Sequence, residues 1–291
     1  YVDVNTEDNV AEDFKCNRKT YDGHKGTDFA LPSAHHMKQG VDVLAAAAGK
    51  IIRLRDGQND TLKTENELEK IKAEQHECGN GILIDHGDGL QTIYCHLKQN
   101  SIIVKRNQRV KAGEKIAQVG QSGMAEFPYL HLGVIWEGGV VDPYTGALNT
   151  DGCNQMKSPL WHLGLPITYE PVVIFDGGFR AQPPNFTAIQ NGEVNPETLS
   201  LNSASFVFWV GFYNVEKGDK VILRITDPDG KAFNEREDII QETRTRQYYF
   251  TGRKIGRVQL MKGQYNGLVQ IIRANTPQAI IREKTFQVTV E

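Results

Sequence analysis

The sequence contains no long hydrophobic run. Its most hydrophobic stretch, residues 43–48, lies between Asp42 and Gly49 and is far shorter than the ~20 residues that a membrane-spanning helix needs. We therefore expect no membrane span in this chain. An excess of positive charge is also missing, because 33 Lys and Arg oppose 36 Asp and Glu, for a net charge of −3. Without a broad basic surface to hold phosphate groups, nucleic acid is not an expected partner.

Cysteine is scarce, and its placement is informative. The four cysteines, Cys16, Cys78, Cys95 and Cys153, all lie in the first 153 residues. An even number confined to one half favours two disulfides in an oxidising compartment, with free buried thiols as the alternative. Residues 81–97 are typical of a hairpin that turns near residues 86–89, which would bring Cys78 and Cys95 opposite each other. We therefore expect Cys78–Cys95 and Cys16–Cys153.

An initiating methionine is absent as well. The sequence begins at Tyr1, which we take to indicate a processed or shortened form from which any signal peptide has already been removed. The expected location, periplasmic or secreted, therefore rests on the cysteines.

The composition is that of a folded protein. Hydrophobic residues make up 39% of the 291 positions, so disorder of the whole chain is excluded, and the length suggests about two domains. Residues 21–150 are rich in glycine and in short strand-like runs, which predicts a mostly antiparallel β domain. The expected strands are 49–55, 81–85, 90–97, 101–104, 115–119 and 130–136.

A charged stretch interrupts this β pattern at residues 61–76. Leu62, Leu68 and Ile71 punctuate a sequence rich in Glu and Lys, as expected of an exposed helix with one thin apolar stripe. We interpret this stretch as a helical insertion between two strands. It is either a solvated surface decoration or a flap beside a binding groove.

The remaining chain predicts a linker and a second β domain. Three prolines with little periodicity place the linker at 151–175, and residues 1–20 are left as an N-terminal tail. In 176–291, about seven short strands are typical of an immunoglobulin-like β-sandwich. The expected runs are 205–213, 220–226, 246–250, 256–261, 268–273 and 285–290.

Three of the eight histidines stand out by their surroundings: His24, His96 and His131. A zinc hydrolase needs three protein ligands from His, Asp, Glu or Cys and leaves a fourth position open. His24, Asp28 and His131 would supply that set. In a straight strand His24 and Asp28 would lie about 13 Å apart, at ~3.3 Å per residue. We therefore expect Gly26 to permit a bend that brings them together.

A family resemblance runs through residues 21–145. It is carried, in order, by His24-x-x-x-Asp28, by segment 80–97 ending in Tyr94-Cys95-His96-Leu97, by segment 110–123, and by Leu130-His131-Leu132-Gly133-Val134 followed by Val141-Asp142-Pro143. In order and spacing these motifs resemble the lysostaphin-type (LytM-like) zinc endopeptidases. The expected fold is therefore all-β, a LytM-like antiparallel β-sheet peptidase domain followed by the C-terminal immunoglobulin-like sandwich, which lies outside the resemblance.

The resemblance implies a site and a reaction. His24, Asp28 and His131 match the zinc ligands of the family, one Zn²⁺ per chain, and His96 matches a catalytic histidine. The implied activity is cleavage of peptide bonds in stem or cross-bridge peptides of bacterial peptidoglycan. The C-terminal domain would position the enzyme on the wall or on a partner protein, which is an expectation from architecture alone.

Tyr129 departs from the family pattern. It occupies the place of the first histidine of the family's His-x-His motif, and in a strand it shares a face with His131. A tyrosine with an ordinary pKa near ~10 is a poor base at pH 7, but its hydroxyl donates a hydrogen bond. The leading function is therefore a peptidase in which Tyr129 stabilises the oxyanion.

Two alternatives remain open at this point. The first is a non-catalytic, zinc-binding module for wall recognition or regulation. The second is a biotinyl- or lipoyl-carrier domain, which two hairpin-like segments resemble. The carrier interpretation leaves His24, Asp28 and His131 unexplained.

Overall fold

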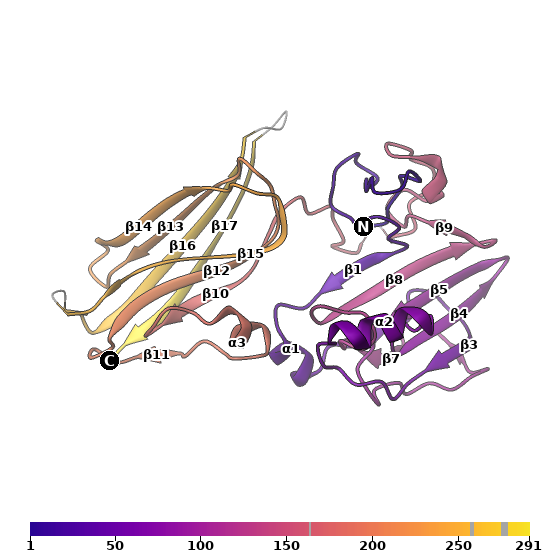
Figure 1. Ribbon diagram of the computed structural model, residues 1–291, viewed down its shortest axis with the longest axis horizontal. Coiled ribbons are helices and arrows are strands. Elements are labelled where there is room, and N and C mark those ends of the chain that lie inside the picture. Colours follow the sequence, from indigo (N-terminus) through magenta and orange to yellow (C-terminus); the bar gives the residue numbers. More distant parts are fainter. Residues whose placement is uncertain (163, 257–258, 275–278) are drawn as a thin grey trace. The chain divides into compact units, whose positions relative to one another are not determined.

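The computed structural model describes residues 1–162, 164–256, 259–274 and 279–291. Within these ranges the chain forms two compact units, Tyr1–Ile167 and Thr168–Glu291, each with its own hydrophobic core (Figure 1). Both units consist mainly of β-strands paired in antiparallel fashion, which confirms the expected all-β class. No helix among the described residues is long and apolar enough to cross a membrane.

The first unit is built on one large sheet. Its strands are β1 (Thr27–Ala30), β2 (Asp42–Leu44), β3 (Gly49–Arg55), β4 (Gly81–Gly87), β5 (Leu90–Cys95), β6 (Arg109–Val110), β7 (Lys115–Gln118), β8 (Tyr129–Trp136) and β9 (Gly139–Val141). Its helices are α1 (Ala34–Gln39), α2 (Glu65–Ala73) and the 3-10 turn η1 (Asn149–Asp151). The sheet order is β1-β8-β5-β4-β3-β6, with β9 paired to β8, while β2 and β7 pair separately.

Alternation along the strands places the core of this unit. Ile82 and Ile84 of β4 and Tyr94 of β5 are fully buried, because residues two apart on a strand project from the same face. Ile82 lies directly opposite Tyr94 in the register of the two strands. Ile116 of β7 packs into the same cluster. The candidate site lies at the edge of the sheet formed by β1, where β1 pairs with β8.

One expected strand of this unit is wrong. Residues 101–104 form no strand, although Ile102 and Ile103 suggest one by composition. The Ser101 amide and hydroxyl both donate to the Lys98 carbonyl, at 3.1 and 2.7 Å, and this turn takes the chain out of an extended course.

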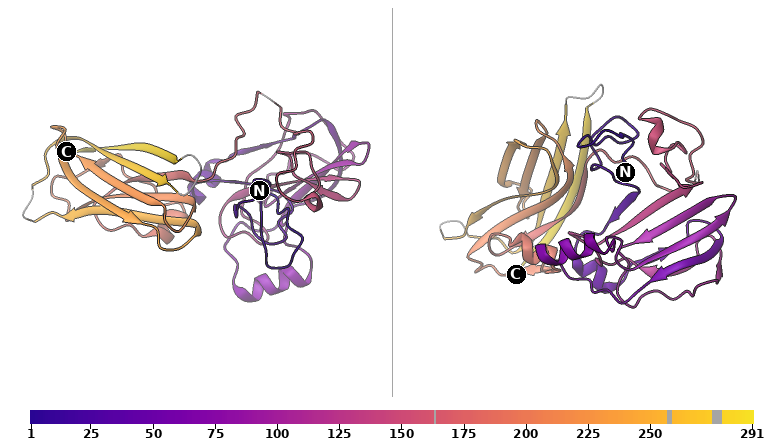
Figure 2. Two further views of the ribbon diagram at one scale, coloured as in Figure 1. Left: turned by 90° about the horizontal axis from the view of Figure 1, so that it is seen from above. Right: turned by 45° about the vertical axis from the view of Figure 1, so that its right-hand side comes forward.

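The expected insertion contains helix α2. Thr64 caps it, and the Thr64 and Glu67 side chains form a reciprocal capping box, which satisfies the first free amides of the helix. None of its residues is buried. Figure 2 shows α2 carried on a loop that leaves the sheet of its own unit.

The N-terminal segment packs onto the first unit, although from sequence it is set apart as a tail. Val2, Val4 and Phe14 are buried, and the segment lies beside the chain that follows β9 (Figure 1). A disulfide joins Cys16 to Cys153, and a second joins Cys78 to Cys95. The Cys78–Cys95 disulfide spans the β4–β5 hairpin, in which β4 ends at Gly87 and β5 begins at Leu90.

The second unit consists of two sheets that share one core. Its elements are β10 (Val173–Arg180), α3 (Phe186–Gln190), β11 (Thr198–Leu199), β12 (Ser205–Val215), β13 (Lys220–Thr226), β14 (Ala232–Ile239), β15 (Arg244–Lys254), β16 (Gly263–Arg273) and β17 (Ile280–Val290). One sheet has the order β10-β12-β15 and the other β11-β17-β16-β13-β14. The shared core includes alternate residues of β12, such as Phe206 and Phe208, together with Leu223 and Ile225 of β13.

The expected strand at 256–261 is also wrong where it can be assessed. Residues 259–261 form no strand, and 257–258 lie outside the described residues. The Met261 amide donates to the Tyr265 hydroxyl, at 3.0 Å, so a side chain of β16 replaces a neighbouring strand as its partner.

Candidate metal centre

Pairing of β1 with β8 brings two of the expected ligands together. The two strands are antiparallel, and Asp28 lies directly opposite His131 in their register. Side chains at directly opposite positions project from the same face and lie within contact distance. His24 precedes β1, and the chain bends at Gly26, as expected.

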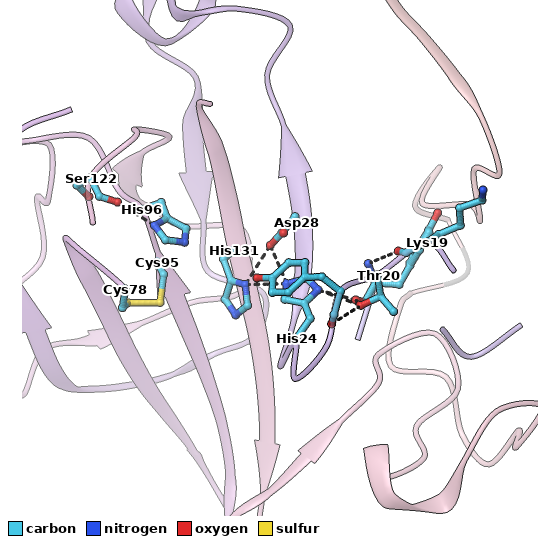
Figure 3. Close-up of polar contacts among 11 residues, drawn as sticks. Lys19, Thr20, His24, Asp28, Cys78, Cys95, His96, Ser122 and His131 are labelled. Carbon is cyan, nitrogen blue, oxygen red and sulfur yellow. Dashed lines mark hydrogen bonds and ion pairs between the residues drawn. A yellow bond between two sulfur atoms is a disulfide. The ribbon is translucent and has the colours of Figure 1, made fainter. Parts of the chain in front are cut away.

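The donor atoms of His24, Asp28 and His131 converge. His24 Nε2 lies 3.1 Å from Asp28 Oδ1 and 3.1 Å from His131 Nδ1, and His131 Nδ1 lies 3.0 Å from Asp28 Oδ1. Figure 3 shows the three side chains turned toward one another. Among the described residues they form a group whose ligand atoms all lie within 4.8 Å of one another.

Gly26 leaves room for one of these rings. A Cβ at this position would lie 2.6 Å from His131 Nε2 and 2.7 Å from the Leu132 carbonyl oxygen, distances that real Cβ atoms do not adopt. The Nε2 edge of His131 therefore faces the glycine, while its Nδ1 edge faces Asp28. Besides permitting the bend, Gly26 provides the space that sets the orientation of His131.

A backbone carbonyl fixes the tautomer of His24. Its Nδ1 lies 2.6 Å from the Tyr1 carbonyl oxygen, which only accepts hydrogen bonds, so Nδ1 carries the hydrogen. Burial lowers the pKa of His24 even though Asp28 opposes that shift. A neutral ring with its hydrogen on Nδ1 presents an unprotonated Nε2 to the cluster, as a metal ligand must.

Asp28 stays ionised in this setting. Burial alone would raise the pKa of its carboxyl group, but the polar contacts with the His131 and His24 rings outweigh burial and hold the pKa well below its usual value. The site thus offers two imidazole nitrogens and one carboxylate oxygen.

This donor set fits Zn²⁺. Zinc binds imidazole nitrogen and carboxylate oxygen, and three protein ligands leave a fourth position open, as in catalytic zinc sites. A second group of three possible donors, Glu12 with Cys16 and Cys153, also lies close together. It does not fit a metal, because the two sulfurs are joined in a disulfide and offer no thiolate.

His96 lies next to the cluster, on the side of His131 (Figure 3). It follows β5 directly, and its ring centroid lies 6.2 Å from that of His131. Its Nδ1 donates to the Ser122 carbonyl oxygen, at 2.8 Å. Burial lowers the pKa of His96 to about 4. At neutral pH the ring is therefore uncharged, with an unprotonated Nε2.

Tyr129 packs against His96. The two ring centroids lie 4.5 Å apart, and Tyr129 is only 7% exposed. Burial, followed by the nearby Asp28 charge, raises the pKa of its hydroxyl well above the usual value. Tyr129 therefore keeps its proton at every physiological pH and can act as a hydrogen-bond donor, but not as a base.

The structure adds residues that the sequence pattern does not single out. Tyr21 stacks on His24, with ring centroids 4.2 Å apart. The Thr20 hydroxyl lies 3.4 Å from His24 Nδ1 and 2.7 Å from the Tyr1 carbonyl. The one signal in the sequence is that Thr20 and Tyr21 lie close to His24. Nothing in the sequence points to the carbonyls of Tyr1 and Ser122.

Comparison with known protein families gives a match over the part of the chain that contains His24, Asp28 and His131. Residues 22–143 match the model of Peptidase family M23. This match confirms the resemblance to lysostaphin-type peptidases over that part of the chain.

Among curated relatives, the peptidoglycan DD-endopeptidase ShyB of Vibrio cholerae is 33% identical over 119 residues, which cover 41% of this chain and 22% of the relative. The chain spans about a fifth of the length of the first curated relatives it matches.

Solved structures include a zinc containing peptidase from Vibrio cholerae, with 31% identity and a TM-score of 0.33, covering 44% of this chain and 32% of that one. The catalytic domain of lysostaphin from Staphylococcus simulans has 23% identity and a TM-score of 0.29, covering 46% and 76%.

Proposed function

We propose that this protein is a zinc-dependent endopeptidase that cleaves peptide bonds of bacterial peptidoglycan. The observation that carries the proposal is the convergence of His24 Nε2, Asp28 Oδ1 and His131 Nδ1 within 4.8 Å. The match of residues 22–143 to a peptidase family and the similarity to a peptidoglycan DD-endopeptidase support the reaction and the substrate class.

His24, Asp28 and His131 would hold the metal. When bound, zinc would supply Lewis acidity, lowering the pKa of water and polarising the substrate carbonyl. The chain itself supplies ligand atoms in the required protonation state. His24 is neutral with its hydrogen directed to Tyr1, and Asp28 is ionised.

His96 is assigned the role of general base. Donation from Nδ1 to the Ser122 carbonyl leaves Nε2 as the atom able to accept a proton, and the lowered pKa keeps the ring neutral. This tautomer favours a base over a stabiliser of the carbonyl oxygen, because an unprotonated Nε2 accepts a proton and donates none.

Tyr129 is assigned the role of hydrogen-bond donor to the oxyanion of the tetrahedral intermediate. Its buried, protonated hydroxyl suits that role, because a fixed donor in a site shielded from water stabilises developing negative charge.

A second candidate function is a zinc-binding module for wall recognition or regulation that cuts slowly or not at all. The observation in its favour is Tyr129 itself. A buried tyrosine with a raised pKa does not accept a proton as a histidine would, and losing a general base typically costs on the order of 10²–10⁴ in rate.

The deciding experiment combines metal analysis with an assay. Zinc content would be measured on protein purified without chelator, together with peptide release from purified peptidoglycan. The parent, Tyr129→His and His96→Ala would be compared. His76→Ala is the matched control, because this side chain is 40% exposed and lies outside the site. We expect about one zinc per chain, release by the parent, and a loss of about 10²–10⁴ for His96→Ala.

Three other outcomes are informative. Zinc without release, with release gained by Tyr129→His, would favour the recognition module. No zinc, even after it is supplied, would contradict the ligand assignment. Parent-like release by His96→Ala would remove its catalytic role.

The second unit is proposed to be an immunoglobulin-like sandwich that positions the enzyme on the wall or on a protein partner, outside the cytoplasm. Its two sheets around one core and the two disulfides of the first unit support this. Deletion of this unit, residues 168–291, should weaken binding to purified sacculi, and unchanged binding would contradict a role in wall targeting.

A further inference from the structure

Residues before the family match surround one side of His24. The Tyr1 carbonyl accepts from His24 Nδ1 at 2.6 Å, and the Asp3 amide donates to the His24 carbonyl at 2.8 Å. The Gly23 amide, one residue before the ligand, donates to Asp3 Oδ2 at 2.8 Å. Both the ring and the backbone of His24 are therefore held by residues outside the segment 22–143 that matches the peptidase family.

The Tyr1 carbonyl is itself fixed. The Thr20 hydroxyl donates to it at 2.7 Å and lies 3.4 Å from His24 Nδ1, so one oxygen accepts from both the hydroxyl and the His24 ring. The Tyr1 ring packs edge-on against Phe14 and Tyr144, with centroids 5.7 and 5.2 Å apart. An acceptor with this much support holds the His24 ring in one orientation.

Asp3 joins the segment to the loop that carries His24. Its side chain is buried, with 2% exposure, and its carboxylate accepts from the amides of Asn5, Glu12 and Gly23 at 3.2, 2.9 and 2.8 Å. A buried carboxylate that is satisfied by backbone amides on both segments couples the position of one to the other.

A covalent link keeps the segment in place. Cys16 is bonded to Cys153, 137 residues away, and the Asn154 amide donates to the Phe14 carbonyl at 2.9 Å. The N-terminal segment is thus tied to the chain after β9, as well as to the loop before β1.

We propose that residues 1–20 are a positioning segment of the metal centre, in which the Tyr1 carbonyl, held by Thr20, and Asp3 fix the tautomer and orientation of the ligand His24. The inference rests on the proposed function, because it concerns the same zinc ligands. Groups that receive the second N–H of a metal-bound histidine typically contribute 10–100-fold in metal affinity. Tight zinc binding therefore depends on this segment as well as on the three ligands.

The test is zinc affinity, measured by competition with a chelator on the full chain. Thr20→Val keeps the shape of the side chain but removes the hydroxyl, and we expect zinc to bind about tenfold more weakly. Thr20→Ser restores the hydroxyl and should restore affinity to within about twofold of the parent. Thr245→Val, at an exposed position of β15, is the matched control and should bind zinc as the parent does.

Asp3→Asn is the second variant. Asparagine has the shape of aspartate but one side-chain acceptor oxygen in place of two. At least one of the three backbone amides that donate to Asp3 therefore loses its acceptor. We expect zinc to bind at least tenfold more weakly, and the absorption spectrum of the Co²⁺-loaded protein to change because the ligand set is distorted. Thermal unfolding of the metal-free protein shows whether the variant is folded.

The outcomes separate the inference from the function on which it rests. If the parent binds zinc and both Thr20→Val and folded Asp3→Asn bind it equally tightly, the positioning role is overturned while the zinc site stands. If Asp3→Asn does not fold, the comparison of Thr20→Val with Thr20→Ser decides alone. If the parent binds no zinc, the proposed function fails first, and the positioning role fails with it.

Discussion

At the scale of single residues, Gly26 is where the site tolerates no added atom. A Cβ there would meet His131 Nε2 at 2.6 Å and the Leu132 carbonyl at 2.7 Å, and β8 cannot yield without disturbing its pairing with β1. We predict that Gly26→Ala displaces the His131 ring and lowers zinc affinity at least tenfold. Gly256→Ala is the control, because a Cβ at Gly256 meets nothing within 4 Å. Equal zinc affinity for both variants would contradict this account.

Asp142 is a second residue with a measurable consequence. Its Oδ1 accepts from the amides of Tyr144 and Thr145, while Oδ2 is buried without a hydrogen-bond partner among the described residues. Burial raises its pKa to about 6. The folded chain therefore binds this proton more tightly than the unfolded chain, in which the pKa is near ~3.9.

The sign of the pH effect follows from that difference. Between about pH 4 and 6 the folded state holds a proton that the unfolded state has lost, so this group's contribution to stability falls as pH rises. We predict that Asp142→Asn, which does not titrate, gains stability relative to the parent by about 1–3 kcal/mol between pH 4 and 7.5. Urea unfolding at the two pH values would measure it, with exposed Asp8→Asn as control. A pH-independent difference would show that the Asp142 pKa is not raised.

Residue patterns single out His24, Asp28 and His131, which the structure brings together, because the kinds of side chain that can bind a metal ion are visible in the sequence. The supporting groups of the site were not predicted, for an equally physical reason. The carbonyls of Tyr1 and Ser122 belong to the backbone, which every residue carries, so only the three-dimensional arrangement distinguishes them. Gly26 was expected to permit a bend, but its need for space beside His131 depends on the β1–β8 pairing.

At the scale of elements, the β4–β5 hairpin and its disulfide support His96. This residue has a left-handed φ of 60°, a conformation that costs a non-glycine residue of order 1–3 kcal/mol. The His96 amide donates to the Cys78 carbonyl at 2.9 Å, and the His96 carbonyl accepts from the Gly120 amide at 3.0 Å. The Cys78–Cys95 bond therefore closes the segment that holds His96 in place.

We predict that the double variant Cys78→Ala, Cys95→Ala loses at least tenfold in peptide release while it keeps its zinc, because His96 is not a ligand. Opening this loop, which spans 17 residues, should also cost about 3 kcal/mol of stability. Zinc content, peptide release and urea unfolding would be measured together. The double variant Cys16→Ala, Cys153→Ala should show the contrasting result, weaker zinc binding. Parent-like release after loss of Cys78–Cys95 would contradict this role of the hairpin.

The same scale shows where sequence patterns succeed and fail. Strands β3 and β13 were predicted with the bounds that the structure has, since their alternation and flanking turns leave one interpretation. Residues 101–104 have the composition of a strand, yet Ser101 forms a turn with Lys98. Composition indicates which residues favour an extended chain, but a strand also needs a continuous ladder of backbone hydrogen bonds. The Ile103 amide donates to the Ile116 carbonyl of β7 at 3.1 Å, and this contact does not extend into a ladder.

At the scale of the whole molecule, each unit contains its own core, and the first extends to Ile167. The chain after β9 contributes to that unit. Trp161 packs edge-on against Phe29 and Tyr144, with centroids 6.1 and 5.9 Å apart, and Cys153 supplies one end of a disulfide. The expected linker, residues 151–175, therefore includes part of the first folded unit. Its proline content predicts a connecting segment but does not reveal these side-chain contacts.

We predict that residues 1–167 fold alone and bind zinc as the full chain does, since a unit with its own core and complete ligand set needs nothing from the other. Residues 1–150 lack Cys153 and Trp161, and the lost disulfide alone should cost about 2–5 kcal/mol. They should unfold at a lower temperature and bind zinc more weakly, because the N-terminal segment beside His24 loses its tether. Calorimetry and chelator competition on the two fragments would measure both. Equal stability and affinity would mean that residues 151–167 act only as a connection, and that the metal centre needs no support from them.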